Sequence, residues 1–253
     1  MKRSFAFLAF LLVVLGVAGC VEQKPVTPQQ AQENVAQVAA TATEIPLDES
    51  MPGAKVDLTP NFYFILDASG TMGSGLPGGG DHEFRTKLDG AKWAIGEFVK
   101  KVPQGANLGL FVFGDDGYGE VVPLCADRKR FLDAVASVQS GGNTPLGEAI
   151  QEGTDKLVEQ YKRQLGYGEY RLIVLTDGMA NGGVDLGDAA LYATKFKVPI
   201  YSIGYGLETD HPLRQYSVSY RTANSSQDLA KGLEETLGET ESFDATEFQA
   251  EKK

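Results

Sequence analysis

Cysteine and histidine are scarce in this sequence. Its 253 residues include two cysteines, Cys20 and Cys125, and two histidines. If Cys20 is modified, as its surroundings indicate below, Cys125 has no partner and no intramolecular disulfide can form, even in an oxidising compartment. We therefore expect Cys125 to be a small, buried apolar side chain. The shortage of both residue types also disfavours zinc, which prefers nitrogen and sulfur ligands.

Positive charge is also in short supply. Lysine and arginine together number 23 against 34 acidic residues, so the net charge at pH 7 is −11. This balance argues against a nucleic-acid partner, whose phosphates select clustered basic side chains, and against docking on an anionic membrane through a basic face. The hydrophobic content of 42% is that of an ordinary globular protein, so the acidic balance is expected to favour solubility.

The first twenty residues contain the three parts of an export signal. Lys2 and Arg3 precede the apolar run 5–15, and small residues then lead to Cys20. The run is short for a helix that spans about 30 Å of hydrocarbon, which requires roughly 20 residues, so a plain membrane anchor is the weaker interpretation. The segment Val17-Ala18-Gly19-Cys20 resembles the lipobox of bacterial lipoproteins.

This resemblance implies a lipid anchor. Residues 1–19 would be removed as a signal peptide, and Cys20, carrying lipid, would become the N terminus and hold the exported protein to a membrane. Val21, rather than aspartate, follows the cysteine. In lipoproteins of cells with two membranes, this implies transport to the outer membrane, on its periplasmic side or at the surface.

The rest of the chain divides into three parts. Residues 20–58 are rich in Gln, Ala, Thr, Glu and Pro and contain no aromatic residue, so we expect a disordered tether after the lipidated cysteine. A short helix near 29–40 is compatible with the sequence but would have little to pack on. Residues 59–238 are expected to form the folded domain, and residues 239–253 a polar C-terminal tail.

Apolar runs alternate with helical patterns through the predicted domain. Continuous apolar runs predict buried strands, whereas apolar residues spaced by three and four predict amphipathic helices. Their alternation predicts an α/β fold with a doubly wound, mostly parallel open sheet covered by helices on both faces. The expected strands are 62–66, 108–113, 120–124 at an edge, 171–176, 199–204 and 220–223, and the expected helices are 84–102, 131–138, 146–161, 186–193 and 226–237.

Two of the predicted strands end in oxygen-bearing side chains. One runs into Asp67-Ala68-Ser69-Gly70-Thr71 and another into Thr176-Asp177-Gly178. Ligands of open α/β sheets bind outside the carboxyl ends of strands, where the winding reverses direction. Thr144 adds a hydroxyl from a glycine-rich loop before a predicted helix. Hydroxyls and carboxylates are hard ligands suited to Mg²⁺.

This pattern resembles the metal-ion-dependent adhesion site of von Willebrand factor type A domains. The matching residues are Asp67-x-Ser69-x-Thr71, Thr144 and Thr176-Asp177-Gly178, and the similarity extends over about residues 61–237. It implies that Ser69, Thr71 and Thr144 ligate Mg²⁺, with Mn²⁺ or Ca²⁺ as substitutes, and that Asp67 and Asp177 act directly or through water.

Two features depart from the family pattern. Thr71 stands where many members have serine, but it retains the hydroxyl and should still bind metal. The long loop 73–82 beside the site puts in doubt any partner inferred from members with shorter loops. The phrase 87–92, Lys-Leu-Asp-Gly-Ala-Lys, again resembles the family.

Each motif also has a purely structural interpretation. Asp67 could simply end a strand, Ser69-Gly70 and Asp177-Gly178 could be turns, and Thr144 could cap the helix that begins near Pro145. Their conjunction at strand ends favours a metal site.

The resemblance implies a membrane-anchored, non-enzymatic module that binds a protein ligand through its metal. An ion held mostly by neutral hydroxyls keeps part of its charge and attracts an outside Asp or Glu carboxylate. One alternative is a metal-free scaffold of an envelope complex. Another is a phosphatase of the haloacid dehalogenase type, which also has an Asp-x-x-Gly-Thr segment but needs a second aspartate where Ser69 stands.

Overall fold

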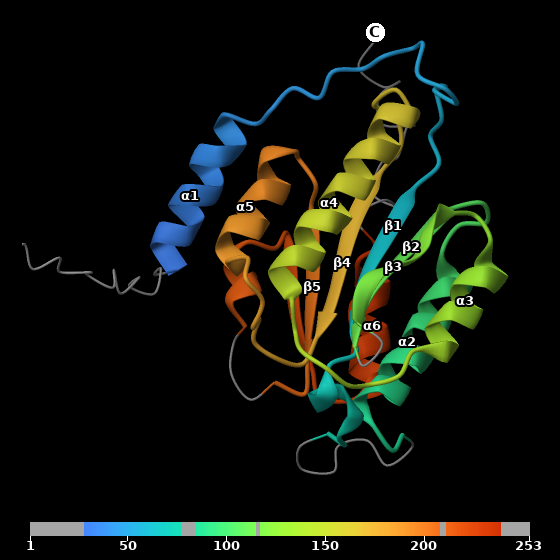
Figure 1. Ribbon diagram of the computed structural model, residues 1–253, viewed down its shortest axis with the longest axis vertical. Helices are drawn as coiled ribbons and strands as arrows, with labels where there is room; N and C mark the ends of the chain where they lie inside the picture. The colour runs from blue at the N-terminus through green and yellow to red at the C-terminus, as the bar shows by residue number, and fades with distance from the viewer. Residues whose placement is uncertain (1–27, 77–83, 115–116, 208–210, 239–253) are drawn as a thin grey trace, which may run out of the picture.

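The computed structural model describes residues 28–76, 84–114, 117–207 and 211–238 (Figure 1). Six strands form one sheet in the order β3-β2-β1-β4-β5-β6, in which every neighbouring pair is parallel except the edge pair β2–β3. The strands are β1 (Asn61–Asp67), β2 (Asn107–Gly114), β3 (Gly117–Cys125), β4 (Tyr170–Thr176), β5 (Ile200–Tyr205) and β6 (Ser219–Ala223). The edge position expected for 120–124 is confirmed.

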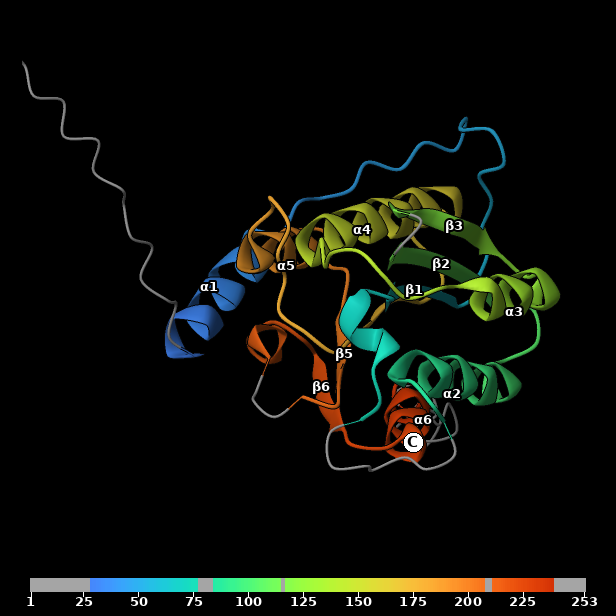
Figure 2. The same ribbon diagram turned by 60° about the horizontal axis from the view of Figure 1, so that its bottom comes forward.

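Helices cover both faces of this sheet (Figures 1 and 2). One face carries α2 (Lys87–Lys101), α3 (Arg128–Ser137) and α6 (Ser226–Glu235), and the other carries α4 (Leu146–Arg163) and α5 (Leu186–Lys195). Alternate residues of β1 serve the two cores, because successive side chains of a strand point to opposite faces. Phe62 and Phe64 belong to the α2 core, whereas Tyr63 and Ile65 belong to the α4 core. The doubly wound, mostly parallel α/β fold is confirmed.

The carboxyl ends of the parallel strands lie along one edge of the sheet, the lower edge in Figure 1. β1 has β2 on one side and β4 on the other, so the winding of the chain reverses there. A single 3-10 turn, η1 (Gly70–Gly73), follows β1 at this edge. This is the place where open α/β sheets bind ligands.

The segment before the sheet begins with a helix, α1 (Pro28–Ala40), which packs against α5. Ala31 is fully buried, and Val35 and Val38 follow at helical spacing and are half-buried. The short helix that the sequence allows near 29–40 is therefore present, and it packs on α5, which the sequence did not lead us to expect. Residues 20–27 of the expected tether lie outside the described residues. A helix of this length is marginal alone, and α5 supplies the apolar surface that the local sequence lacks.

Residues 41–60, here called the strap, connect α1 to β1 across the opposite edge of the sheet (Figure 1). The Thr43 N–H donates a 2.9 Å hydrogen bond to the Lys195 carbonyl at the end of α5. The Lys55 N–H donates a 2.9 Å bond to the Arg163 carbonyl at the end of α4. Both ends of the strap are thus attached to the helices of one face.

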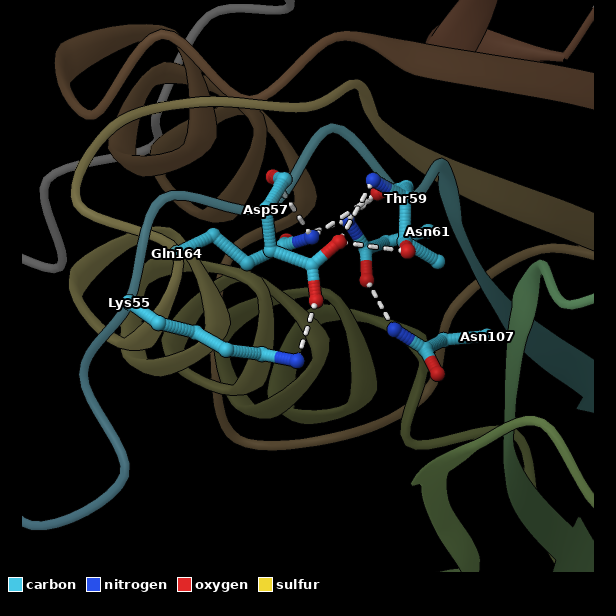
Figure 3. Close-up of polar contacts among 6 residues, drawn as sticks. All are labelled: Lys55, Asp57, Thr59, Asn61, Asn107 and Gln164. Atoms are coloured by element: carbon cyan, nitrogen blue, oxygen red, sulfur yellow. Dashed lines mark hydrogen bonds and ion pairs between the residues drawn. The ribbon is translucent and has the colours of Figure 1, made fainter.

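A polar network holds the strap at the start of β1 (Figure 3). Gln164 is buried; its amide nitrogen donates to the Thr59 carbonyl at 2.9 Å, and its amide oxygen accepts from Asn61 Nδ2 at 2.7 Å. Hydrogen bonds from the Thr59 hydroxyl and N–H lower the pKa of Asp57 to about 2. These contacts satisfy the buried amide groups of Asn61 and Gln164 with partners on the half-buried strap.

Some sequence-based predictions fall on other parts of the chain. The signal peptide 1–19, Cys20, residues 77–82 of the long loop and the tail 239–253 lie outside the described residues. Within the described ranges, no helix has the length and apolar content needed to cross a membrane. Cys125 is a free thiol at the end of β3 that is half-buried against the core, rather than fully buried as expected.

Candidate metal centre

β1 and β4 together position the first carboxylate. Asp67 is the last residue of β1 and is fully buried. Its Oδ1 accepts a 2.8 Å hydrogen bond from the Ser69 N–H, and its Oδ2 accepts a 2.7 Å bond from the Thr176 hydroxyl at the end of β4. Burial raises the pKa of Asp67, and the charge of Asp177 adds to this rise against the opposing hydrogen bonds. A cation beside Asp67 would therefore stabilise its charged form.

The turn after β1 brings two hydroxyls to the second carboxylate. Ser69 Oγ and Thr71 Oγ1 lie 3.2 Å apart, and the Thr71 hydroxyl donates a 2.8 Å bond to Asp177 Oδ1. Asp177 directly follows β4 and is buried, as is Ser69, whereas Thr71 is exposed. Asp67, Ser69, Thr71 and Asp177 thus form one connected polar group that is open to solvent on the Thr71 side.

Thr144 lies on a loop that packs against this group. The Gly141 N–H donates a 2.8 Å bond to the Ala68 carbonyl, which places the loop beside the turn after β1. Gly142 has a φ of +68°, a conformation that glycine adopts without steric cost. The N-cap of α4 is Pro145, with no side-chain cap, so the interpretation of Thr144 as the helix cap is wrong. The Thr144 hydroxyl does not cap α4.

The loop after Asp177 is fastened to the start of α4. The Thr144 N–H donates a 2.7 Å bond to Asn181 Oδ1, and the Asn181 N–H donates a 3.0 Å bond to the Thr144 carbonyl. Glu148 Oε1 accepts from the N–H groups of Gly183 and Val184 at 2.6 and 3.2 Å. Thr144 and Asp177 therefore belong to segments that are held together by side chains outside the predicted set.

A buried histidine holds the same loop from the other side. His211 Nδ1 accepts a 3.2 Å bond from the Leu213 N–H, so its Nε2 carries the proton and donates to the Gly178 carbonyl at 3.0 Å. Burial lowers the pKa of His211, against the opposing effect of the bond to Gly178. The buried environment therefore favours the neutral form of the His211 imidazole.

Lys87 contributes a positive charge that sequence reasoning did not assign to the site. It is the first residue of α2, is buried, and forms an ion pair with Asp177 Oδ2. One signal was present in the sequence: a lysine in the first turn of a helix opposes the helix dipole. Asn181, Glu148 and His211 gave no comparable signal, because the site residues that they hold, Thr144, Gly183 and Gly178, lie at least 33 residues away in the chain.

The donor set fits a hard divalent cation. Oxygen atoms that are neighbours in an octahedron with bonds of about 2.1 Å lie roughly 3 Å apart. The Ser69–Thr71 and Thr71–Asp177 oxygen distances are 3.2 and 2.8 Å. Within the described residues, no group of three or more His, Cys, Asp or Glu side chains could hold a metal, so a metal held here would rely on the hydroxyls.

The part of the chain that forms the sheet and its covering helices matches a known protein family. Residues 61–238 match the von Willebrand factor type A domain. The uncharacterized protein YwmC of Bacillus subtilis (strain 168) is 26% identical over 159 residues, which cover 57% of this chain and 66% of that protein.

Solved structures share the fold at lower identity. The pilus adhesin SpaC from Lactobacillus rhamnosus GG has a TM-score of 0.56 at 14% identity, over 74% of this chain and 31% of that chain. Proximal thread matrix protein 1 from the mussel byssus, in a structure with a zinc-occupied MIDAS motif, has a TM-score of 0.54 at 17% identity, over 72% of this chain and 46% of that chain.

Proposed function

Because this chain belongs to the von Willebrand factor type A domain family, we propose that it is a non-enzymatic module that binds a protein ligand through a divalent metal ion. The observation that carries the proposal is the connected oxygen group of Asp67, Ser69, Thr71 and Asp177 at the carboxyl ends of β1 and β4. Mg²⁺ suits these hard ligands, with Mn²⁺ or Ca²⁺ as substitutes. Similarity in fold to a byssus protein with a zinc-occupied MIDAS motif supports a divalent ion as the ligand.

Two kinds of side chain would hold the ion. Ser69, Thr71 and Thr144 would hold it through neutral hydroxyls, and Asp67 and Asp177 directly or through water. The hydrogen bond from Thr71 to Asp177 Oδ1 orients the exposed hydroxyl. The bound ion supplies a partly compensated positive charge, which attracts a carboxylate from solvent on the Thr71 side.

The partner is proposed to offer one Asp or Glu within a neutral or basic rim. Removal of Lys2 and Arg3 with the signal peptide would change the net charge from −11 to −13. An acidic partner would then be repelled everywhere except at the metal. The loops 73–82 and 141–144 are proposed to meet this rim.

The simplest test compares ligand binding with and without metal. Thermal unfolding of the purified domain should shift upward with millimolar Mg²⁺, Mn²⁺ or Ca²⁺, because an ion that binds only the native state stabilises it. In a pull-down from envelope extract, the proteins that the wild-type domain retains in Mg²⁺ should be lost when a chelator is added. They should also be lost with Asp177→Ala or Thr144→Ala, while the circular dichroism spectra of these variants stay native. A wild type indifferent to all three ions would support the metal-free scaffold instead.

The dehalogenase-like alternative is weakened by the environment of Asp67. A nucleophilic aspartate needs an accessible oxygen, whereas Asp67 is fully buried and both of its oxygens accept hydrogen bonds. Ser69 occupies the position of the required acid and cannot transfer a proton near neutral pH. Absence of phosphatase turnover by the purified domain would agree with this argument.

A lipid on Cys20 is proposed to anchor the module to a membrane, the outer membrane in a cell with two. Eight residue steps separate Cys20 from Pro28, where α1 begins, and they extend at most about 28 Å. The domain would therefore stay close to the bilayer. Cys20→Ala should abolish labelling by a palmitate analogue and release the protein from membranes, whereas Cys125→Ala should do neither. Wild-type protein that takes up no label would contradict the anchor.

A further inference from the structure

Lys87 places an ammonium group inside the candidate metal centre. Its Nζ pairs with Asp177 Oδ2, and the two side chains are 9% and 0% exposed. The other oxygen of the same carboxylate accepts the hydrogen bond from Thr71. A lysine is almost never buried to this degree unless it is paired, because burial of an isolated charge is costly.

The local sequence does not favour a lysine at this position. Thr86 is the N-cap of α2, and its hydroxyl accepts a 3.1 Å bond from the Asp89 N–H. Lys87 follows in the first turn, where the positive end of the helix dipole repels a cation. The Lys87 N–H donates a 2.8 Å bond to the Ser74 carbonyl, which fixes the backbone beside the turn after β1. Such conflicts between local preference and observed structure are expected at functional sites.

We propose that Lys87 is an internal counter-cation, which holds Asp177 in the metal-free domain and leaves it when a divalent ion binds. This inference rests on the proposed metal function. Exchange of the ammonium for a divalent ion makes the net charge of this group one unit more positive. The two cations together would repel each other within the buried group.

The exchange explains how the site can select the charge of its ion. A monovalent ion brings no more charge than the ammonium that it would displace, whereas a divalent ion does. The lysine stem is long and flexible, so its ammonium can move into water while its backbone stays at the start of α2. Lys87 therefore stabilises the empty domain and weakens metal binding at the same time.

Mn²⁺ titration of Lys87→Met, followed by calorimetry and by the electron paramagnetic resonance of free Mn²⁺, tests this exchange. Methionine keeps an unbranched apolar stem and removes the charge. The dissociation constant for Mn²⁺ should fall about tenfold or more, while the melting temperature of the metal-free protein also falls. Lys92→Met is the matched control, because Lys92 lies on the same helix and donates to the Ala136 and Val138 carbonyls. It should leave the dissociation constant unchanged.

The outcomes separate the two proposals. Mn²⁺ binding by the wild type, lost in Asp177→Asn but no tighter in Lys87→Met, overturns the exchange and leaves the metal function standing. No Mn²⁺ binding by either the wild type or Lys87→Met overturns both.

Amine labelling of the wild type with mass spectrometry gives a readout that needs no variant. Lys87 should react several-fold faster in saturating Mn²⁺ than in chelator, relative to Lys92. Equal protection of Lys87 in both conditions would overturn the exchange.

Discussion

Thr71 and Asp177 are 106 residues apart in the chain, yet the Thr71 hydroxyl donates a 2.8 Å hydrogen bond to Asp177 Oδ1. This bond joins the turn after β1 to the end of β4 across the candidate metal centre. Thr71 is exposed, whereas Asp177 is buried. The pair can therefore be altered at Thr71 with little effect on packing.

Thr71→Val and Thr71→Ser test the exposed hydroxyl. Valine has nearly the shape of threonine without its oxygen, so the free energy of unfolding without metal should change by only about 1 kcal/mol. The rise in melting temperature with Mg²⁺ should disappear in Thr71→Val and persist in Thr71→Ser, measured by differential scanning fluorimetry. A full Mg²⁺ response in Thr71→Val would mean that the ion binds elsewhere.

Asn181→Ala tests whether the loop after Asp177 positions Thr144. Loss of the Asn181 side chain removes the acceptor of the 2.7 Å bond from the Thr144 N–H. We expect a several-fold weaker affinity for Mn²⁺ by calorimetry, although Asn181 itself need not touch the ion. Asn143→Ala, an exposed neighbour of Thr144, should leave the affinity unchanged. Equal Mn²⁺ affinities of Asn181→Ala and Asn143→Ala would show that Asn181 does not position Thr144 for the ion.

Because His211 is buried, we expect the folded domain to lose stability in mild acid. Burial lowers its pKa below the ordinary value of 6.5, so below that pH the unfolded chain binds a proton that the folded domain does not. The free energy of unfolding should therefore fall as the pH falls through 6.5, by at most about 1.4 kcal/mol per pH unit, and level off below the folded pKa.

Urea unfolding at pH 7.5 and 5.5 measures this contribution. His211→Gln retains polar atoms but does not titrate, so it should be less stable at pH 7.5 and should lose that part of the pH slope. His82 is present in both proteins and cancels in the comparison. The same slope in wild type and variant would assign the pH dependence to other groups.

Gln164→Ala tests the attachment of the strap shown in Figure 3. The substitution removes the 2.7 Å bond from Asn61 Nδ2 and the 2.9 Å bond to the Thr59 carbonyl, and leaves the direct bond from Asn61 to the Thr59 carbonyl as their remaining link. We expect the free energy of unfolding to fall by about 1–3 kcal/mol and limited proteolysis to cut within residues 41–60 sooner. Gln160→Ala, one turn earlier on α4, should behave as wild type. Unchanged cleavage would show that the bonds to Lys195 and Arg163 suffice.

The sequence by itself determined the types and order of the strands and α-helices within the expected domain, residues 59–238. The apolar run 62–66 and the three–four spacing in 84–102 each lie within one window of the chain, and β1 and α2 formed where these patterns predicted them. The same is true of the strand ends at Asp67 and Asp177, because parallel strands necessarily bring their carboxyl ends to one edge. These features depend on local periodicity and on the handedness of the crossovers.

Only the tertiary structure decided what surrounds those carboxylates. Lys87 reaches Asp177 and Asn181 reaches Thr144 because α2 and the loop after β4 meet at one edge of the sheet. Likewise α1 packs against α5, which supplies the apolar surface that the sequence of α1 itself lacks. Each of these contacts joins segments that are distant in the chain. Their free energy depends on how whole elements pack, and no local window of the sequence contains that information.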